Sequence, residues 1–361
     1  MPAFPPLLRR NWPLAAIATI VAALAATFAW AAGWIGAPRL TAQRVTNAIE
    51  AANGRVYPGF RRAHAKGVCV TGHFASNGAG AALTRAGMLA PGATTPVLGR
   101  LSIAGGDPHA PDATTRVRSM ALLLANADGQ QWRMAMNSFP FFAVATPQGF
   151  HDQAVASRPD PATGKPDPAK MAELLLRHPE IRRFQQWAKT APWADSWGNT
   201  AFNSVNAFRF TDASGQVNFV RWSMRPRLAF AAMDKATRAD AEADYLAKDL
   251  QARLANGPLR WDLVLSVAAP GDPINDPSRA WPEDRQQVIA GTLALDTAQD
   301  QAEGACRDVN YDPTVLPHGI RPSDDPVLAA RAAVYAQSYN RREREIAHGQ
   351  APKTGHSESA R

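Results

Sequence analysis

The sequence predicts an α+β fold with an antiparallel β-sheet or barrel at its core and helices around it. Short runs of β-forming residues follow one another along the chain, separated by glycine and Asp-Gly turns, and the helical segments are grouped apart from them. With 46% hydrophobic and 19% charged residues, the composition is typical of a globular protein and excludes a disordered chain or a coiled coil. A chain of 361 residues can bury a substantial core.

An apolar segment near the N-terminus, residues 12–35, predicts one transmembrane helix. No charged residue lies between Arg10 and Arg39, and as a helix the segment would span roughly 36 Å, enough to cross a bilayer. We expect residues 1–11 to be a short cytoplasmic leader and the bulk of the chain to lie in the periplasm, outside the cytoplasm. Whether this anchor is an uncleaved signal stays open, because Ala29-Trp30-Ala31 offers a small-x-small cleavage pattern.

Residues 41–345 are expected to form one folded domain. Alternating and apolar runs bounded by turn residues predict strands at 68–74, 97–103, 120–125, 131–136, 141–145, 201–210, 217–224 and 259–267. Helical spacing predicts helices at 41–52, 169–189, 240–255 and 325–344. Ser323 is the expected N-cap of the last helix, with Pro326 in its first turn. The polar tail, 346–361, is expected to be disordered.

Charge and cysteine content limit the classes of partner and site. The excess of 39 Lys+Arg over 31 Asp+Glu gives +8, which favours an anionic surface or ligand. No block of five or six like charges is present, so we expect no nucleic-acid partner. Cys69 and Cys306 are too few for a disulfide framework or a Cys-rich metal site. They could pair in an oxidising compartment or remain unpaired in the core.

Four ordered segments together resemble the haem catalases. Residues 61–67, Arg-Arg-Ala-His-Ala-Lys-Gly, resemble the strand that carries the family's distal histidine, here His64. Arg100-Leu-Ser102 resembles the family's Arg-Phe-Ser, and residues 137–142 resemble its Asn-Asn-Thr-Pro-x-Phe, with Asn137 at the family's spacing from His64. Residues 323–335 resemble the helix that bears the Arg-x-x-x-Tyr motif of the haem ligand.

The resemblance implies catalytic roles for three of these residues. His64 would take a proton from one peroxide oxygen and return it to the other, which a neutral imidazole can do near pH 7. Asn137 would orient the peroxide by a hydrogen bond that adds no charge. Ser102 would hold the His64 ring through its other nitrogen and so fix the tautomer.

It also implies a haem b (iron protoporphyrin) cofactor with Tyr335 as the axial ligand of the iron. Arg331 lies one helical turn before Tyr335, so its cation can reach the tyrosine oxygen and favour the phenolate. The remaining cofactor-binding residues implied by the resemblance are Arg61, Arg100, Arg342 and Phe150. The arginines would pair with the haem carboxylates, and Phe150 would pack over the ring.

Residues 45–345 carry the resemblance, which is nearest to the short catalase-related peroxidases. It implies an antiparallel β-barrel and reduction of hydrogen peroxide or organic hydroperoxides by an unknown small reductant, with weak catalase activity. Two alternatives remain: a membrane-tethered haem-binding or redox-sensing protein without turnover, and an enzyme that rearranges fatty-acid hydroperoxides. The oligomeric state stays open. One departure from the family is Arg62-Ala63, which replaces the usual pair of valines before the distal histidine.

Overall fold

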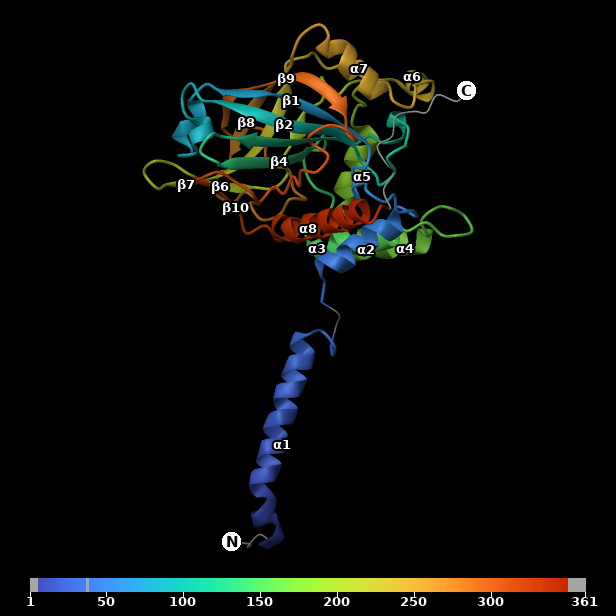
Figure 1. Ribbon diagram of the computed structural model, residues 1–361, viewed down its shortest axis with the longest axis vertical. Coiled ribbons are helices and arrows are strands. Elements are labelled where there is room, and N and C mark those ends of the chain that lie inside the picture. Colours follow the sequence, from blue (N-terminus) through green and yellow to red (C-terminus); the bar gives the residue numbers. More distant parts are fainter. Residues whose placement is uncertain (1–5, 37–38, 350–361) are drawn as a thin grey trace. The chain divides into compact units, whose positions relative to one another are not determined.

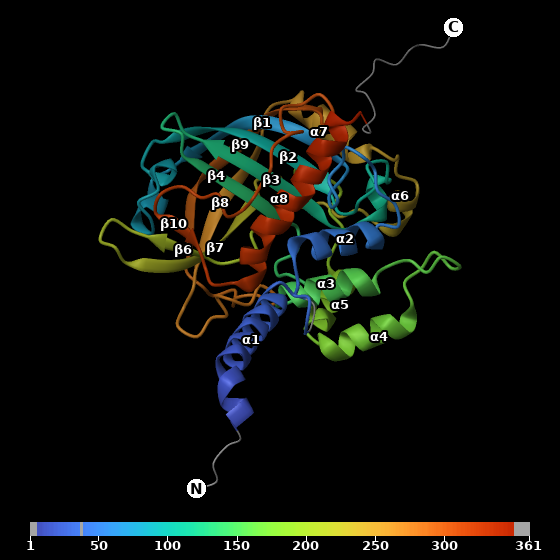
Figure 2. The same ribbon diagram turned by 60° about the horizontal axis from the view of Figure 1, so that its bottom comes forward.

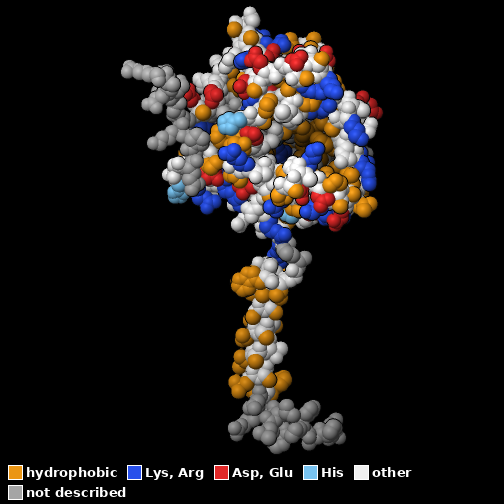
Figure 3. Space-filling view, turned by 90° about the vertical axis from the view of Figure 1, so that its right-hand side faces the viewer, with side chains coloured by type: hydrophobic (Ala, Val, Ile, Leu, Met, Phe, Trp, Pro, Cys, Tyr) orange, Lys and Arg blue, Asp and Glu red, His pale blue; other side chains and the backbone are white. Residues whose placement is uncertain are grey.

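The computed structural model describes residues 6–36 and 39–349, and the chain divides into two units, residues 1–41 and 42–361. The first unit contains α1 (Pro6–Ala31). In the described residues, Trp12–Ala31 is one stretch of helix long and apolar enough to cross a membrane, and hydrophobic side chains follow its length (Figure 3). The helix ends four residues before the predicted boundary, ahead of Gly33 and Gly36, whose φ values of 75° and 94° are left-handed. The expected start of the leader, residues 1–5, and most of the expected tail, 350–361, lie outside the described residues.

The second unit is built on a closed antiparallel barrel (Figure 1). Around the ring the strands follow the order β7-β5-β4-β3-β2-β1-β9-β8, and β8 pairs back with β7 to close it. Their bounds are β1 (Gly67–Ser76), β2 (Thr94–Ile103), β3 (Arg118–Ala125), β4 (Gln131–Asn137), β5 (Phe202–Asn203), β7 (Val217–Pro226), β8 (Leu259–Val267) and β9 (Gln287–Asp300). Two short strands, β6 (Phe208–Thr211) and β10 (Ile320–Pro322), continue the sheet beyond β7.

Strand alternation separates the two faces of this barrel. Large apolar side chains such as Trp132, Met134 and Leu122 fill the interior and are fully buried. The alternate positions of β2, β3 and β4 point outward, and at these positions lie Arg100, Ser102, Ser119, Ala121, Ala135 and Asn137. The polar candidates of three neighbouring strands therefore share the outer face.

Helices pack around the barrel, and α8 (Pro326–Ala347) covers that face (Figure 2). They are α2 (Ala42–Ala52), α3 (Pro147–Ala156), α4 (Pro168–Arg177), α5 (Ile181–Thr190), α6 (Lys235–Ala239), α7 (Tyr245–Leu254) and α8 (Pro326–Ala347), with 3₁₀ turns η1 (Ala79–Ala82), η2 (Gly87–Leu89) and η3 (Asp112–Thr114). Helix α8 lies across β2–β4, with α2 beside it (Figure 2). The N-cap of α8 is Asp325 rather than the predicted Ser323, because the Asp325 carboxylate accepts from the Val327 and Leu328 amides at 2.8 and 3.3 Å.

Most predicted strands are confirmed, and the differences have local causes. The strand expected at 141–145 is wrong, since this segment is irregular and its buried residues pack in a separate hydrophobic cluster. The helix expected at 169–189 is two helices, because Pro179 interrupts it. The strand expected at 201–210 is divided at Val205, whose φ is 57°. Strand β9 was not predicted; Gly291 lies within it, where a Cβ atom would meet the Ala75 carbonyl oxygen at 2.4 Å.

Cys69 and Cys306 form a disulfide, which settles the alternative that the sequence left open. Their Cα atoms lie 5.4 Å apart, and 237 residues separate them in the chain. Cys69 lies in β1 and Cys306 in the loop after β9. In the chain-entropy model, closing a loop of this length restricts the unfolded chain and contributes about 5 kcal/mol to stability. The disulfide therefore fastens the 301–311 segment to the barrel wall.

Candidate active site

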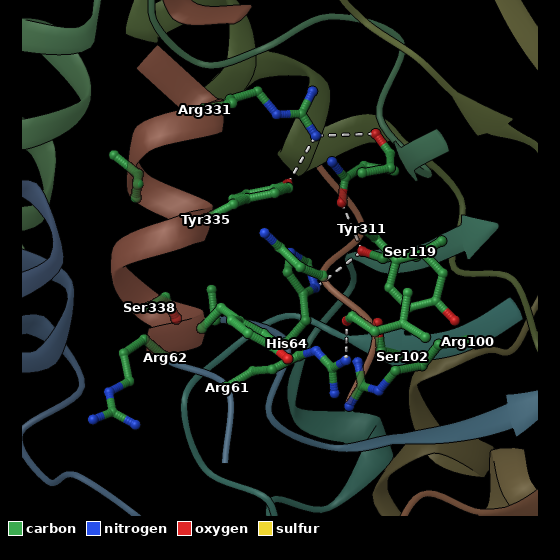
Figure 4. A pocket seen from close by; sticks show the side chains of 18 of the residues that line it. Arg61, Arg62, His64, Arg100, Ser102, Ser119, Tyr311, Arg331, Tyr335 and Ser338 are labelled. Carbon is green, nitrogen blue, oxygen red and sulfur yellow. Dashed lines mark hydrogen bonds between the residues drawn. The ribbon is translucent and has the colours of Figure 1, made fainter. Parts of the chain in front are cut away.

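A cavity of about 150 Å³, partly open to solvent, lies between the outer face of β2–β4 and helix α8 (Figure 4). Ala121 and Ala135 line it from neighbouring positions of β3 and β4. Their methyl groups leave space that larger side chains would fill. The same cavity is lined by eight of the residues predicted from the sequence: His64, Asn137, Ser102, Arg61, Arg100, Arg331, Tyr335 and Arg342.

His64 and Asn137 are joined by a serine that sequence reasoning missed. Ser119 Oγ lies 3.0 Å from His64 Nδ1 and donates to Asn137 Oδ1 at 2.6 Å. In the register of the sheet, Ser119 pairs with Ser102 on one side and with Asn137 on the other. Ser102 also lines the cavity, but the hydroxyl bonded to the His64 ring is that of Ser119, which corrects the expected role of Ser102.

This chain of hydrogen bonds determines which atoms face the cavity. A serine hydroxyl carries one hydrogen, and that of Ser119 is donated to Asn137. The Ser119 oxygen is then placed to accept from His64, which assigns the ring proton to Nδ1 and the lone pair to Nε2. Because Asn137 Oδ1 is already an acceptor, its Nδ2 amide remains as a donor. The wall thus presents one acceptor and one donor.

The backbone and the electrostatics of His64 are both unusual. His64 lies in the turn before β1, not on a strand, and its φ is 56°, a conformation uncommon for a non-glycine residue. Burial, with the positive charges of Arg100 and Arg331 adding to it, lowers the pKa of His64 to about 4. The imidazole is therefore neutral at physiological pH.

Tyr335 faces the cavity from α8. Arg331, one turn earlier, donates to the Tyr335 oxygen at 2.9 Å and to the Ala135 carbonyl of β4 at 3.1 Å. A second guanidinium nitrogen of Arg331 donates to Asn206 at 2.6 Å. The contact between Arg331 and the Tyr335 oxygen is the one that the helical spacing of the two residues predicts. Tyr339, a turn later, lies instead under the guanidinium of Arg342, 5.2 Å from the ring centroid.

Three guanidinium groups gather at another part of the cavity. Arg61 is held by the carbonyls of the 306–309 segment, at 2.9 to 3.1 Å, and Arg100 donates to the Ala65 carbonyl at 3.0 Å and to Gln301 at 2.5 Å. Burial and each other's charge lower the pKa of Arg61 well below its usual range, and burial lowers the pKa of Arg100 to about 10. Within the described residues, Nε of Arg100 and of Arg342 are buried without a partner. The cluster is therefore suited to an anion with several oxygens.

The structure does not bring Phe150 to the cavity. Phe150 lies on α3, a helix that the sequence did not predict, and stacks on Phe142 with ring centroids 5.8 Å apart in a separate cluster. Tyr311 lines the cavity and was missed. Burial raises the pKa of its phenol to about 12, and it packs beside the disulfide.

Comparison with known proteins decides the family. The profile of the catalase family matches residues 36–352. The chain belongs to the catalase family. It is 37% identical to a catalase-related peroxidase of Synechococcus elongatus over 92% of this chain and 97% of that protein. It is 33% identical to a catalase-related peroxidase of Mycolicibacterium paratuberculosis, over 83% of this chain and 94% of that one. A Pseudomonas aeruginosa catalase is 27% identical, and the match covers 56% of its length.

Solved structures agree on the fold. A bacterial catalase superposes with a TM-score of 0.71 at 22% identity, covering 85% of this chain and 62% of that one. A fungal catalase gives 0.70 at 19% identity. As a member of this family the chain is a peroxide-acting oxidoreductase with a haem cofactor. The β-barrel with surrounding helices predicted from the sequence is confirmed.

Substituting each of the two serines separates their roles. We expect Ser119→Ala to lower peroxide turnover by about 10- to 100-fold, because His64 and Asn137 lose the hydroxyl that orients both. Ser102→Ala, in the neighbouring strand, serves as the matched control and is expected to change turnover less than threefold. Steady-state rates with hydrogen peroxide measure both, and a larger loss in Ser102→Ala would restore the role expected from sequence.

The low pKa of His64 predicts the pH dependence of the reaction. Nε2 can accept a proton from peroxide only while the imidazole is neutral. We therefore expect kcat/KM to stay level from pH 8 to about 5 and to fall as the pH approaches 4. The unfolded chain binds this proton near pH 6.5 and the folded chain does not. His64 therefore costs no stability above pH 6.5 and lowers it progressively as the pH falls toward 4. An acid limb centred on pH 6.5 would contradict the assignment.

Proposed function

We propose that this chain is a haem b peroxidase that reduces hydrogen peroxide or organic hydroperoxides with a small reductant. The observation that carries the proposal is that two hydrogen-bonded groups of residues face each other across one cavity, one on the barrel and one on α8. His64, Ser119 and Asn137 form a hydrogen-bonded chain on the barrel side, and Arg331 and Tyr335 form another on α8. Weak dismutation of hydrogen peroxide belongs to the same proposal.

The barrel wall supplies the proton transfer. His64 Nε2 takes the proton from one peroxide oxygen and, as imidazolium, returns it to the other. Asn137 Nδ2 donates a hydrogen bond to the bound peroxide and orients it without adding charge. The other polar atom of each side chain, His64 Nδ1 and Asn137 Oδ1, is hydrogen-bonded to Ser119. Because the pKa of His64 is low, the imidazolium is a strong acid and returns the proton readily.

The residues present fit the cofactor. When bound, haem supplies the redox-active iron at which peroxide is reduced. Tyr335 is the residue that would ligate the iron, with Arg331 holding the tyrosine oxygen. Arg61, Arg100 and Arg342 would bind the two haem carboxylates, which would supply acceptors for the Nε atoms of Arg100 and Arg342 and negative charge beside Arg61 and Arg100. Phe150 is not part of this set.

The peroxide pocket has room for more than hydrogen peroxide. Ala63 is exposed and lines the cavity where the family has a branched residue next to the distal histidine. Its small side chain leaves the approach to His64 wider. This supports organic hydroperoxides as substrates alongside hydrogen peroxide.

We further propose that residues 12–35 anchor the chain and that the catalytic unit lies in the periplasm. Two observations support this. The stretch Trp12–Ala31 has the length and composition of a span, and the cysteines of the sequence, Cys69 and Cys306, are paired. Disulfides persist in oxidising compartments and are rare in the cytosol.

Substitutions at the two walls test the enzymatic proposal. The purified full-length chain is loaded with haem and followed by its visible spectrum and by turnover of hydrogen peroxide and tert-butyl hydroperoxide. We expect Tyr335→Phe to lose or shift the Soret band, and Tyr339→Phe, its neighbour on the same helix, to keep it. We expect His64→Ala to keep haem and to lose turnover by about 10²- to 10⁴-fold.

The outcomes separate the alternatives. Haem binding without turnover in the wild-type chain would favour a redox-sensing protein. Consumption of a fatty-acid hydroperoxide without any reductant would favour a rearranging enzyme. Turnover that persists at the original rate in His64→Ala would contradict the mechanism.

Protease treatment of spheroplasts tests the location. We expect added protease to degrade the catalytic unit while a cytoplasmic marker stays intact, and maleimide reagents to label Cys69 and Cys306 only after reduction. Protection of the catalytic unit from protease, together with thiols that react without reduction, would place the unit in the cytoplasm instead.

A further inference from the structure

Arg62 is a buried arginine two residues before His64, where the family has a valine. Its side chain is 5% exposed and points away from the His64 ring (Figure 4). It donates from Nε to Glu50 at 2.7 Å and pairs with both carboxylate oxygens of Glu345, one of them at 2.9 Å. Burial alone would lower the pKa of Arg62, but hydrogen bonds with Glu345 and Glu50 raise it above its usual value.

These contacts join three segments that are distant in sequence. Glu50 lies on α2, Arg62 lies in the turn before β1, and Glu345 lies on α8. Glu345 also accepts from the Gly59 amide at 2.9 Å. Arg341 on α8 pairs with the second oxygen of Glu50 at 2.6 Å. The positive charges of the two arginines therefore equal the negative charges of the two glutamates. We call these four residues the Arg62 cluster.

The backbone at His64 needs support from both sides. A φ of 56° in a non-glycine residue costs free energy and persists only where neighbouring contacts impose it. On the C-terminal side, Ala65 donates to the Gly105 carbonyl at 2.9 Å, and its own carbonyl accepts from Arg100 and Gln301 at 3.0 and 3.1 Å.

On the N-terminal side, the corresponding support is Arg62. Its carbonyl accepts from Asn53 Nδ2 at 2.7 Å, and its side chain is fixed by the two glutamates. Arg62 also donates to the Phe60 carbonyl at 3.0 Å, which closes the turn on itself. A valine at this position could keep the bond from Asn53 to the backbone carbonyl, but it could make none of the side-chain hydrogen bonds of Arg62.

We propose that Arg62 is a positioning residue that fixes the His64 turn to α8, and so sets the place of the His64 ring relative to Tyr335. The inference rests on the catalytic role proposed for His64. A buried ion pair is weak grounds for added stability, because desolvation offsets much of the attraction. Its stronger effect is to fix the turn in one position relative to α8, because a bidentate contact between a guanidinium and a carboxylate has a defined geometry.

The test removes the positioning while keeping the charges balanced. In Arg62→Val with Glu345→Gln, the chain loses one buried charge of each sign, so stability changes little. We expect this variant, loaded with haem, to keep the Soret band and a KM within about twofold of wild type. Its kcat should fall about 10- to 100-fold, because a misplaced group lowers the rate of the step and not the binding. Arg62→Lys, which keeps the charge, should recover part of the loss.

Arg341→Gln is the matched control. It removes an arginine of the same cluster from α8, on the far side of Glu50, and leaves the contact between Arg62 and Glu345. We expect it to lower the melting temperature without changing kcat. If it lowers kcat as much as the Arg62 variant, the cluster acts through stability and the proposal is overturned.

A readout without haem keeps the inference separate from the proposed function. In the haem-free full-length chain, ¹⁵N shifts of the histidine rings report the tautomer, which we expect to be Nδ1–H at His64 in the wild type, identified by its loss in His64→Ala. In the variant Arg62→Val with Glu345→Gln, the shifts should move toward those of a mixed tautomer, while they stay in place in Arg341→Gln. Unchanged shifts and unchanged kcat would overturn the role of Arg62. Altered shifts together with full turnover in His64→Ala would instead contradict the proposed function.

Discussion

The site depends on the position of α8 over the barrel, and Arg331 is the residue that fixes it. One guanidinium reaches Tyr335 on its own helix, the Ala135 carbonyl on β4, and Asn206 in the loop before β6. Asn206 in turn donates to Asp325 at 2.6 Å, the carboxylate that caps α8. The same arginine therefore attaches the helix to the barrel and orients the tyrosine. Any shift of α8 would change the width of the cavity and the direction of Tyr335 together.

The electrostatics of the cavity follow from what surrounds its arginines. Arg61 and Arg100 are held by carbonyl and amide oxygens, which orient a guanidinium but do not neutralise it. Their positive charges act on His64, whose pKa is lowered by burial and by Arg100. Bound carboxylates would relieve the repulsion among the guanidiniums, whereas the desolvation of His64 would remain. The part of the site that holds an anion is thus coupled to the part that needs a neutral base.

The sequence predicted those features that short motifs carry and missed those that depend on contacts between distant segments. His64, Asn137, Arg331 and Tyr335 belong to local patterns, and the cavity brings them together. Ser119 was missed because the predicted strand began one residue after it, although Ser119, Ala121 and Leu123 alternate outward in the register of β3. Phe150 was misplaced because α3, not predicted, directs it to Phe142. Pairing of Cys69 with Cys306 and of Arg62 with Glu345 could not be predicted, since each joins residues hundreds of positions apart.

The disulfide and the Arg62 cluster act on opposite sides of His64 and divide one task between them. Cys306 lies in the segment whose carbonyls hold Arg61, so the disulfide fixes that arginine and, through Gln301 and Arg100, the carbonyl of Ala65. Arg62 fixes the backbone on the other side of the histidine. The disulfide lies in a buried cluster, with Cys69 2% and Cys306 0% exposed, and it holds that side of the turn covalently. The ion pairs of the Arg62 cluster lie where α2, α8 and the turn before β1 meet, and there the directed contacts of one guanidinium hold three segments at once.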